Sequence, residues 1–481
     1  MKNIFFFLLI LLSNVLVGQS DFVSSQYYID SNNGDDNNNG IEINYPWKTF
    51  ENLKLLKLYP GDNILLKSGS VFNDNLEFND SGSLNNPIVM TSFGKGDKPI
   101  INGNGKESFT VMLRNVEYWE LDGFEITNNG KARKEKRTGL TILAEDSGVL
   151  HNIIIKNLVV RDVNGSLIKQ DGGGSGILIR KSDINIPSKF DGLHIINCHI
   201  YNTERNAINF RAAPNREGWF PNLNVIVRNN LIEKVPGDGI VIVGCDGALV
   251  EYNTLRDFPD ILPHSEPAAG IWPWSSDNTL VQFNEVSGHR AKRDGQGYDS
   301  DWNSNGTIIQ NNYSHDNYGG FLLICNSGKS YNTKINIGTK NTIIRNNISV
   351  NDGIRPYPTE LKGVFSPIFH ITGPVEGSYI YNNIIILPKR EANIDKTLIR
   401  IDNWGGPWPI NTLFENNIFY FEDDFGIELN GVKDIYFNNN EFSYKIKNFN
   451  IDYNENKTGI TNEFVLKKII NKMNFGSTQV K

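Results

Sequence analysis

A repeating phrase is the feature that most constrains the fold of this chain. Two or three β-branched or aliphatic residues precede a polar residue, an asparagine and a second alternating apolar pair. The shared asparagines are Asn157, Asn197, Asn230, Asn253, Asn284, Asn312, Asn347, Asn383 and Asn417. The shortest interval, from 230 to 253, is 23 residues, and longer intervals contain Gly-, Pro- and Asp-rich insertions. Self-similarity at such a period indicates a solenoid.

A unit of this length fits one coil of a parallel β-helix, whose short strands stack about 4.8 Å apart. An asparagine at one turn of every coil can bond its amide to the asparagines above and below it. General asparagine abundance would also produce many copies, but it would not place them after the same apolar pattern. We therefore expect an all-β, single-domain right-handed parallel β-helix of roughly 10–12 coils with an N-terminal cap.

The ends of the chain differ from the repeat. Lys2 precedes an apolar run, and Gly18 and Ser20 are the small residues that a signal peptidase needs. The run is too short to span a membrane. We expect a secreted or periplasmic protein without a membrane span. The expected parts are a signal peptide at 1–19, an N-terminal cap and first coils at 20–120, a β-helix with cleft-forming loop insertions at 121–445, and a C-terminal cap or tail at 446–481.

Charge and cysteine content narrow the possible partners. The formal net charge of −7 argues against nucleic acid, although a local basic groove could still bind an anionic polysaccharide. Cys198, Cys245 and Cys325 are an odd, sparse set without a C-x-x-C spacing, so we expect buried spacers and no disulfide framework or metal site. We expect a monomer that requires no cofactor. Calcium is a candidate ligand of the Asp/Asn-rich turn at 30–40, for which a solvated loop is the simpler interpretation.

A second strand follows each asparagine phrase and is usually opened by glycine. Alternate residues of a strand face opposite sides. The expected inward residues are Ile177, Ile208, Ile240, Ile271, Tyr298 and Phe321. One outward column holds Leu178, Asn209, Val241, Trp272, Asp299 and Leu322. The other holds Arg180, Arg211, Val243, Trp274, Asp301 and Ile324.

The segment DGQGYDSDW at 294–302 breaks the apolar pattern with two carboxylates on one face. The Cβ atoms of Asp299 and Asp301 would lie roughly 6.5–7 Å apart on a strand. Like charges at this distance raise the pKa of one group, so the pair is a candidate acid and base. A calcium site or hydrogen bonding within a turn would also explain two aspartates.

Aromatic residues and loop insertions point to the same face. Trp272, Trp274 and Trp302 would form costly exposed apolar surface without a ligand, unless the loop at 255–269 buries them. The insertions at 256–269 and 287–294 are expected to wall a cleft.

These loops and the neighbouring coils supply further candidates. The additional expected catalytic groups are Asp294, Glu266 and His315, although His315 could simply face solvent. The expected substrate-binding residues are Trp272, Trp274, Asn209, Arg211, Trp302, His370 and Arg293. His370 would extend the first outward column. The tryptophans of NWGGPW at 403–408 could form a distal sugar subsite or cap the last coils.

Two regions carry a family resemblance. The N-terminal segments YYIDSNNGDDNNNG, PWKTF, PGDNILLKSGSVF and NPIVMTSFGKGDKPIING resemble the same region of bacterial right-handed β-helix proteins, many of which act on polysaccharides. DGQGYDSDW with the following HDNYGGFLL resembles segments of bacterial β-helix glycosidases. The resemblance implies a carbohydrate-active enzyme, but it does not choose the reaction, because this fold hosts both hydrolases and lyases.

Three functions remain open from the sequence. The first is a glycoside hydrolase acting through the aspartate pair, inverting because the expected separation is wide, and endo-acting in an open cleft. The second is a polysaccharide lyase in which Lys292, Arg293, Arg211 or Arg180 acts with aspartate-bound calcium. The third is a non-catalytic glycan-binding repeat protein, which would need the tryptophans but not the carboxylates.

Overall fold

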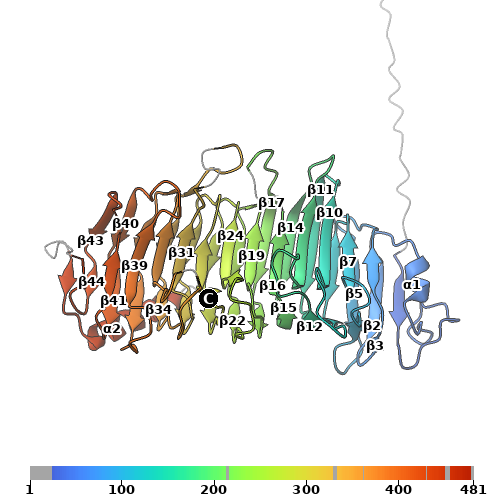
Figure 1. Ribbon diagram of the computed structural model, residues 1–481. Coiled ribbons are helices and arrows are strands. Elements are labelled where there is room, and N and C mark those ends of the chain that lie inside the picture. Colours follow the sequence, from blue (N-terminus) through green and yellow to red (C-terminus); the bar gives the residue numbers. More distant parts are fainter. Residues whose placement is uncertain are drawn as a thin grey trace, which may run out of the picture.

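The chain forms a long solenoid whose coils follow one another along a single axis (Figure 1). The computed structural model describes residues 24–212, 216–328, 333–360, 362–429, 431–449 and 456–477. The expected signal peptide lies outside these residues. Over the described range, strands of successive coils pair in parallel and build three long sheets. The expected all-β parallel helix is therefore confirmed.

The first sheet has 15 strands in the described part of the chain. In sheet order they are β1 (Gln26–Ile29), β2 (Asn63–Lys67), β5 (Ile88–Phe93), β8 (Trp119–Asp122), β11 (Val149–Lys156), β14 (Lys189–Ile196), β17 (Asn222–Arg228), β21 (Leu249–Glu251), β25 (Leu280–Gln282), β29 (Ile308–Gln310), β33 (Ile343–Arg345), β37 (Tyr379–Tyr381), β40 (Thr412–Glu415) and β43 (Ile435–Asn438), with β20 (Cys245–Asp246) beside β17.

The second sheet has 12 described strands, one per coil, in agreement with the expected number of coils. They are β4 (Leu76–Phe78), β7 (Val111–Arg114), β10 (Thr138–Glu145), β13 (Ser175–Ser182), β16 (Asn206–Arg211), β19 (Ile240–Val243), β24 (Ile271–Trp274), β28 (Tyr298–Ser300), β31 (Leu322–Cys325), β35 (Phe369–Thr372), β39 (Thr397–Asp402) and β42 (Gly426–Glu428).

The third sheet has 14 strands within the described ranges. They are β3 (Val71–Phe72), β6 (Ile100–Asn102), β9 (Glu125–Asn128), β12 (Val159–Asn164), β15 (His199–Glu204), β18 (Leu231–Glu233), β22 (Thr254–Arg256), β26 (Glu285–Ser287), β30 (Tyr313–His315), β34 (Ile348–Val350), β38 (Ile384–Leu387), β41 (Ile418–Phe421), β44 (Glu441–Phe442) and β45 (Lys457–Thr458). Two short pairs lie outside the long sheets: β23 (Pro267–Ala268) with β27 (Arg293–Asp294), and β32 (Thr339–Lys340) with β36 (Val375–Glu376).

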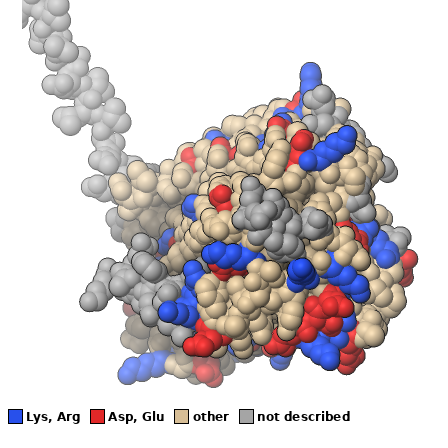
Figure 2. Space-filling view, turned by 90° about the vertical axis from the view of Figure 1, so that its left-hand side faces the viewer, with Lys and Arg blue, Asp and Glu red and all other residues tan. Residues whose placement is uncertain are grey.

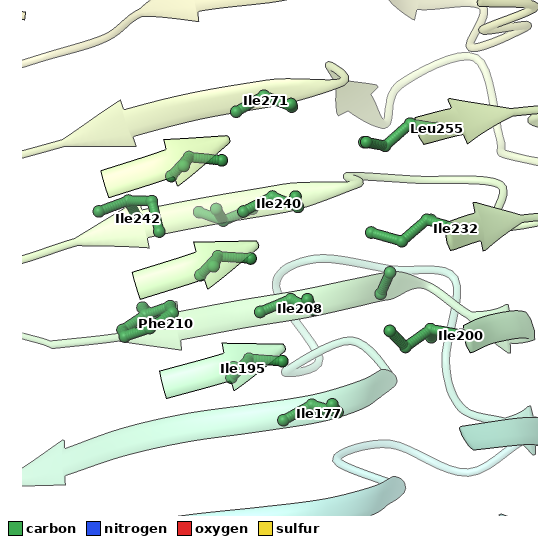
Figure 3. Close-up of a cluster of buried hydrophobic side chains, with 14 of the residues drawn as sticks. Ile177, Ile195, Ile200, Ile208, Phe210, Ile232, Ile240, Ile242, Leu255 and Ile271 are labelled. Carbon is green, nitrogen blue, oxygen red and sulfur yellow. The ribbon is translucent and has the colours of Figure 1, made fainter. Parts of the chain in front are cut away.

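Stacked aliphatic columns fill the interior of the coils. Ile177, Ile208, Ile240 and Ile271 of the second sheet are all 0% exposed and lie above one another (Figure 3). Isoleucine and leucine side chains of the third sheet face them across the interior. The inward positions expected for these four residues are therefore confirmed. Burial of these columns is the main stabilising contribution of each coil.

An asparagine ladder runs along one corner of the solenoid. The Asn253 amide donates to Oδ1 of Asn284 at 2.9 Å and to the Val227 carbonyl at 2.9 Å, and the Asn253 Oδ1 accepts from the Asn230 backbone N–H. The same bonding connects Asn230, Asn253, Asn284, Asn312, Asn347, Asn383, Asn417, Asn440 and Asn456. These bonds satisfy amides that lie within the core.

Two of the expected ladder positions are wrong. Asn157 and Asn197 take the preceding turn position, with φ of 54° and 55°, and the Asn197 amide reaches Asn157 outside the core. Cys198 holds the ladder position in its coil, since its backbone N–H donates to Oδ1 of Asn230 at 2.9 Å. The ladder therefore begins at Asn230.

Two helices accompany the coils. α1 (Glu51–Leu55) lies at the N-terminal end, where Leu53 is buried (Figure 1). α2 (Asn462–Ser477) packs against the outer face of the third sheet, with Val465 on Ile384 and Ile418. Neither helix is long and apolar enough to cross a membrane, nor is any other described helix.

The C-terminal end of the solenoid has a charged surface. Figure 2 shows basic and acidic side chains interspersed around this end of the molecule. Charged side chains at a strand edge oppose the addition of further strands from another chain.

Candidate active site

One cavity of about 410 Å³ opens on the outer face of the second sheet, near the middle of the solenoid. Its floor comes from β24, β28, β31 and β35, and its walls come from loops that enter or leave these strands. The expected insertions at 256–269 and 287–294 contribute to the walls, as does the segment 355–366. Polar and aromatic side chains from separate coils therefore meet in one enclosure.

Strand pairing fixes which side chains share the floor. Val241 pairs with Trp272, Asp299 with Leu323, and Leu323 with His370. His370 therefore continues the first outward column, as expected. The register expected for residues 320–324 is off by one, because Phe321 occupies the turn before β31 and packs its ring on Tyr298. Leu323 and Cys325, rather than Leu322 and Ile324, line the cavity.

Asp299 lies at the bottom of the cavity. Its side chain belongs to a residue that is 5% exposed, and its buried Oδ1 has no hydrogen-bond partner in the described part of the chain. Burial raises its pKa well above the usual value, and the charges of Asp301, Asp294 and Asp238 raise it further. Asp299 is therefore protonated under conditions in which an ordinary aspartate is ionised.

Asp301 has a different environment, although it lies only two residues further along. Its Oδ1 accepts hydrogen bonds from the Trp302 backbone N–H at 2.7 Å and from the Cys325 thiol at 3.0 Å. Burial raises its pKa to about 6, against the opposing effect of these two donors. Asp301 can therefore change protonation state near neutral pH.

Asp294 approaches the same cavity from the wall. It lies in β27, with a φ of 58°, and β27 pairs with β23 of the preceding insertion. The buried guanidinium of Arg355 donates to its backbone carbonyl and to the Ser366 hydroxyl. This link joins the 287–294 wall to the 355–366 wall and fixes the backbone of Asp294, which lines the cavity.

A buried ion-pair network supports the opposite end of the cavity. Asp238 accepts from Arg205 at 2.5 Å and from the Trp272 indole at 3.1 Å. Burial opposes ionisation of Asp238, but Lys169, Arg205 and hydrogen bonds from Ala269 and Trp272 together lower its pKa. Lys169 lies 4.8 Å above the Trp272 ring and 4.0 Å from Asp238. Asp238 and Lys169 both line the cavity.

Tryptophans form much of the apolar lining. Trp274, Trp302 and Trp404 contact one another edge-to-face, at centroid distances of 6.2 Å and 5.9 Å. Trp404 belongs to the NWGGPW segment and lines the same cavity. Trp272 is only 4% exposed, so it presents a limited edge to the cavity, which is closer to the buried alternative than to an open face.

The far end of the cavity is cationic and aromatic. Lys362 and Arg400 lie 4.5 Å and 5.1 Å from the Phe365 ring centroid. His370 interacts with Asp402 at 3.2 Å. Burial opposes ionisation of Asp402, but His370, Thr372 and Lys362 outweigh it and lower its pKa. Arg293 lines this region from the 287–294 wall.

Four of the residues expected at the site lie outside the cavity lining. Glu266 accepts from the Lys169 backbone N–H at 2.8 Å and pairs with Arg205 at 3.3 Å, so it supports the buried network. His315 lies in the third sheet between Glu285 and Asp316, because its coil places it one sheet away. Asn209 bonds Ser175 and Arg211 bonds the Gly172 carbonyl, both in coils before the cavity. The sequence placed these four residues at the site, and the structure places them outside the cavity lining.

The structure brings Asp294, Asp299, Asp301, Trp272, Trp274, Trp302, His370 and Arg293 together around the cavity. Sequence reasoning missed Asp238, Lys169 and Lys362. Asp238 lies just before β19, beside the glycine that opens the strand, and an acidic residue entering one coil would have been the signal. Lys169 and Lys362 carry no such signal, since each belongs to an irregular loop.

Cys198, Cys245 and Cys325 are free and buried. Among the residues described, no group of three His, Cys, Asp or Glu side chains is arranged to hold a metal ion.

Comparisons with known proteins agree with the fold and the region of the site. A family model described as a right-handed β-helix region matches residues 175–357. Lacto-N-biosidase from Bifidobacterium longum subsp. longum is 28% identical over 475 residues, which cover 79% of this chain and 28% of that protein. This chain thus spans little more than a quarter of the length of that curated relative.

A solved structure gives a similar result. The crystal structure of GH136 lacto-N-biosidase from Eubacterium ramulus superposes with a TM-score of 0.65 at 25% identity, covering 84% of this chain and 68% of that one. The family model's range of 175–357 includes β24, β28 and β31 of the cavity floor, whereas β35 lies beyond it. The chain is therefore a right-handed parallel β-helix protein that is similar to two lacto-N-biosidases.

Proposed function

We propose that this protein is a glycoside hydrolase that cleaves a polysaccharide by carboxylate acid/base chemistry. The observation that carries the proposal is the meeting of Asp294, Asp299 and Asp301 in one aromatic-walled cavity. Glycoside hydrolysis needs one carboxyl group to protonate the leaving oxygen and a second to activate water or attack the sugar. The similarity to two lacto-N-biosidases supports this reaction class.

Asp301 is proposed as the carboxylate that acts as base or nucleophile. Two hydrogen bonds hold its Oδ1 and favour the ionised form, which leaves the second oxygen for the substrate or water. Its pKa of about 6 makes this form available at neutral pH.

Two residues can supply the proton. The raised pKa of Asp299 favours it as the proton donor, because its carboxyl group keeps the proton. Asp294 is supported by its place on the wall, where it is less buried than Asp299 and better placed to exchange a proton with solvent. Whichever of the two is the proton donor, its loss should matter only for substrates whose leaving group needs protonation.

Substitution of each aspartate by asparagine separates the roles. Asp301→Asn should lower kcat/KM by at least about 1,000-fold on every substrate. The variant of the true proton donor should lose activity on the natural glycan but keep it on an aryl glycoside, whose leaving group needs no protonation. If all three variants keep parental activity on the natural glycan, the proposed chemistry is wrong.

A product screen tests the reaction class. The purified protein is incubated with marine and plant polysaccharides and with lacto-N-biose-containing oligosaccharides, which the names of the relatives suggest. A hydrolase forms reducing ends without new ultraviolet absorbance. Products with an unsaturated uronate band, together with loss of activity in chelator, would instead support the lyase. Binding without any product would support a non-catalytic glycan-binding protein.

The finer features remain part of the proposal. Inversion rests on the wide separation expected between Asp299 and Asp301 along one strand. Proton NMR of the first-formed anomer tests it, and retention of configuration would reject it. Endo-action rests on the length of the cavity floor across four strands. Release of a single small product from the start of the reaction would contradict endo-action.

We further propose a secreted or periplasmic monomer that needs no cofactor. The apolar N-terminal segment supports export. Fractionation of the producing cells and size-exclusion chromatography test location and oligomeric state. Activity measured before and after extensive dialysis against EDTA tests whether calcium is needed.

A further inference from the structure

A second feature lies at the corner between the first and third sheets, away from the cavity. The residue before each ladder asparagine has a positive φ, from 50° to 58° over the coils that start at Asn229. In six of these eight described coils this residue is itself asparagine: Asn229, Asn311, Asn346, Asn382, Asn416 and Asn439. In the two consecutive coils between Asn229 and Asn311 it is Tyr252 and Phe283, each with a φ of 56°.

Aromatic residues are unfavourable at this backbone position. Asparagine tolerates the left-handed region, because its short polar side chain can bond locally, whereas a bulky side chain there is a genuine outlier. Such strain costs of order 1–3 kcal/mol per residue and persists mainly at functional sites. Two neighbouring coils carry this strain although asparagine serves the same turn elsewhere in the solenoid.

The two rings form a platform in which Tyr252 is exposed and Phe283 is half-buried. Their centroids are 5.0 Å apart and their planes differ by 8°, so the rings are stacked. Tyr252 is 45% exposed, and Tyr313 beside them is 38% exposed. Together with Glu285, these three aromatic residues line a shallow hollow of about 440 Å³, which shares no lining residue with the active-site cavity.

The chemistry of this hollow suits a neutral sugar. Exposed aromatic rings offer apolar faces against which the C–H face of a pyranose can pack. The phenol groups of Tyr252 and Tyr313 form no hydrogen bond within the described part of the chain, so they are available to sugar hydroxyls. The Glu285 carboxylate can accept further hydroxyl bonds, and it disfavours an anionic ligand, as does the net charge of −7.

We propose that Tyr252, Phe283 and Tyr313 form a second, non-catalytic binding site for a neutral glycan chain. The site would hold a polysaccharide against the solenoid while the cavity acts elsewhere on it. Binding here does not depend on the reaction class proposed for the cavity, because the two sites share no residue.

The test replaces both aromatic residues by the residue that other coils use at the same turn. Tyr252→Asn with Phe283→Asn is made in an Asp301→Asn background, which prevents turnover. Tyr436→Ala, which removes another exposed tyrosine of the first sheet, is the matched control. Affinity electrophoresis of the full chain in gels containing galactomannan, xyloglucan, mixed-linkage β-glucan or, as the anionic probe, alginate measures the dissociation constants.

We expect at least one neutral polysaccharide to retard the parent, and the double substitution to weaken that binding by about tenfold or more. Tyr436→Ala should bind as the parent does. The double variant should have an equal or higher Tm, since asparagine relieves the backbone strain. This combination of weaker binding and undiminished stability is the result that a packing role would not give.

Other outcomes overturn the proposal. Unchanged retardation by every neutral polysaccharide, or no retardation of the parent, would reject the site. A lower Tm with unchanged binding would show that the rings serve the fold. A parent that sediments as a dimer, and a double variant that sediments as a monomer, would assign the platform to a second copy of the chain. Stronger binding of alginate than of the neutral chains would reject the stated ligand class.

Discussion

Two aspartates in the cavity show how burial and hydrogen bonding give different pKa values to chemically identical groups. Asp299 and Asp301 are two positions apart on one strand, yet only Asp301 has donors from Trp302 and Cys325. Asp299 has a buried oxygen without a partner in the described residues. The pKa of Asp299 therefore rises well above its usual value, whereas the pKa of Asp301 rises only to about 6.

The thiol of Cys325 gives a prediction about pH dependence. Its hydrogen bond favours ionised Asp301, so Cys325→Ala should raise the pKa of Asp301. If Asp301 must be ionised to act, activity rises with pH through about 6, and the variant should move this acidic limb to higher pH. The pH profile of kcat/KM measures the shift. Cys325→Ser keeps a donor and should restore the parental limb; equal profiles for all three proteins would exclude the coupling.

Asp299 gives a prediction about stability. The pKa of Asp299 in the folded state is raised above its ordinary value of 3.8. The stabilising contribution of this carboxyl group is therefore fully present only below pH 3.8, and it is lost as pH rises through the folded-state pKa. Asp299→Asn removes the titrating group, so its Tm should exceed that of the parent at pH 7 by more than at pH 4. Differential scanning calorimetry at both pH values measures the difference. A variant that is less stable at pH 7 would contradict the assigned burial cost.

Several strands of the coils could be registered from the sequence, whereas the asparagine turns between them could not all be registered. Strict alternation identified the inward column from Ile177 to Ile271, because burial of one face leaves a period of two. The ladder was harder to register, since asparagine serves two adjacent positions: the positive-φ turn and the buried ladder. In Asn229-Asn230 both roles are filled, whereas Asn197 fills only the first and Cys198 takes the second. Composition cannot distinguish these roles without the bonding partners.

The ladder predicts unequal effects for two asparagines. Asn312→Ala should lower the unfolding free energy by about 2–4 kcal/mol, because it leaves buried partners in the coils on either side unpaired. Asn416→Gly should have little effect, since glycine adopts the φ of 53° that this turn requires. Urea denaturation followed by circular dichroism measures both. Similar losses for the two variants would show that the ladder has no special contribution.

At the scale of the molecule, the cavity draws residues from widely separated coils. Its lining extends from Lys169 to Trp404, although the floor is limited to four successive strands. The sequence located the floor through the broken repeat at 294–302, but it could not place the 355–366 wall, because irregular loops carry no periodicity to register. Asp238 was missed for a related reason, since its role depends on Arg205 and Trp272 from the neighbouring coils.

The linear architecture predicts a gradient of local stability. Each coil packs mainly on the two beside it, so opening can start at the ends without disturbing the middle. Hydrogen–deuterium exchange followed by mass spectrometry should find slow exchange in β19, β24 and β28, and faster exchange in β42 to β45. Uniform protection along the whole solenoid would indicate one cooperative unit instead.

The separation between a repeating core and the loops that wall the cavity also has an evolutionary consequence. The hydrogen bonds and aliphatic columns of each coil lie inside the three sheets, whereas the insertions leave from their edges. A gene can therefore lengthen, shorten or exchange one wall while the register of the strands is preserved. Duplication of a coil near either end would lengthen the molecule and leave the cavity floor intact. Selection for new glycans can therefore act on the loops, because the coils tolerate changes in them.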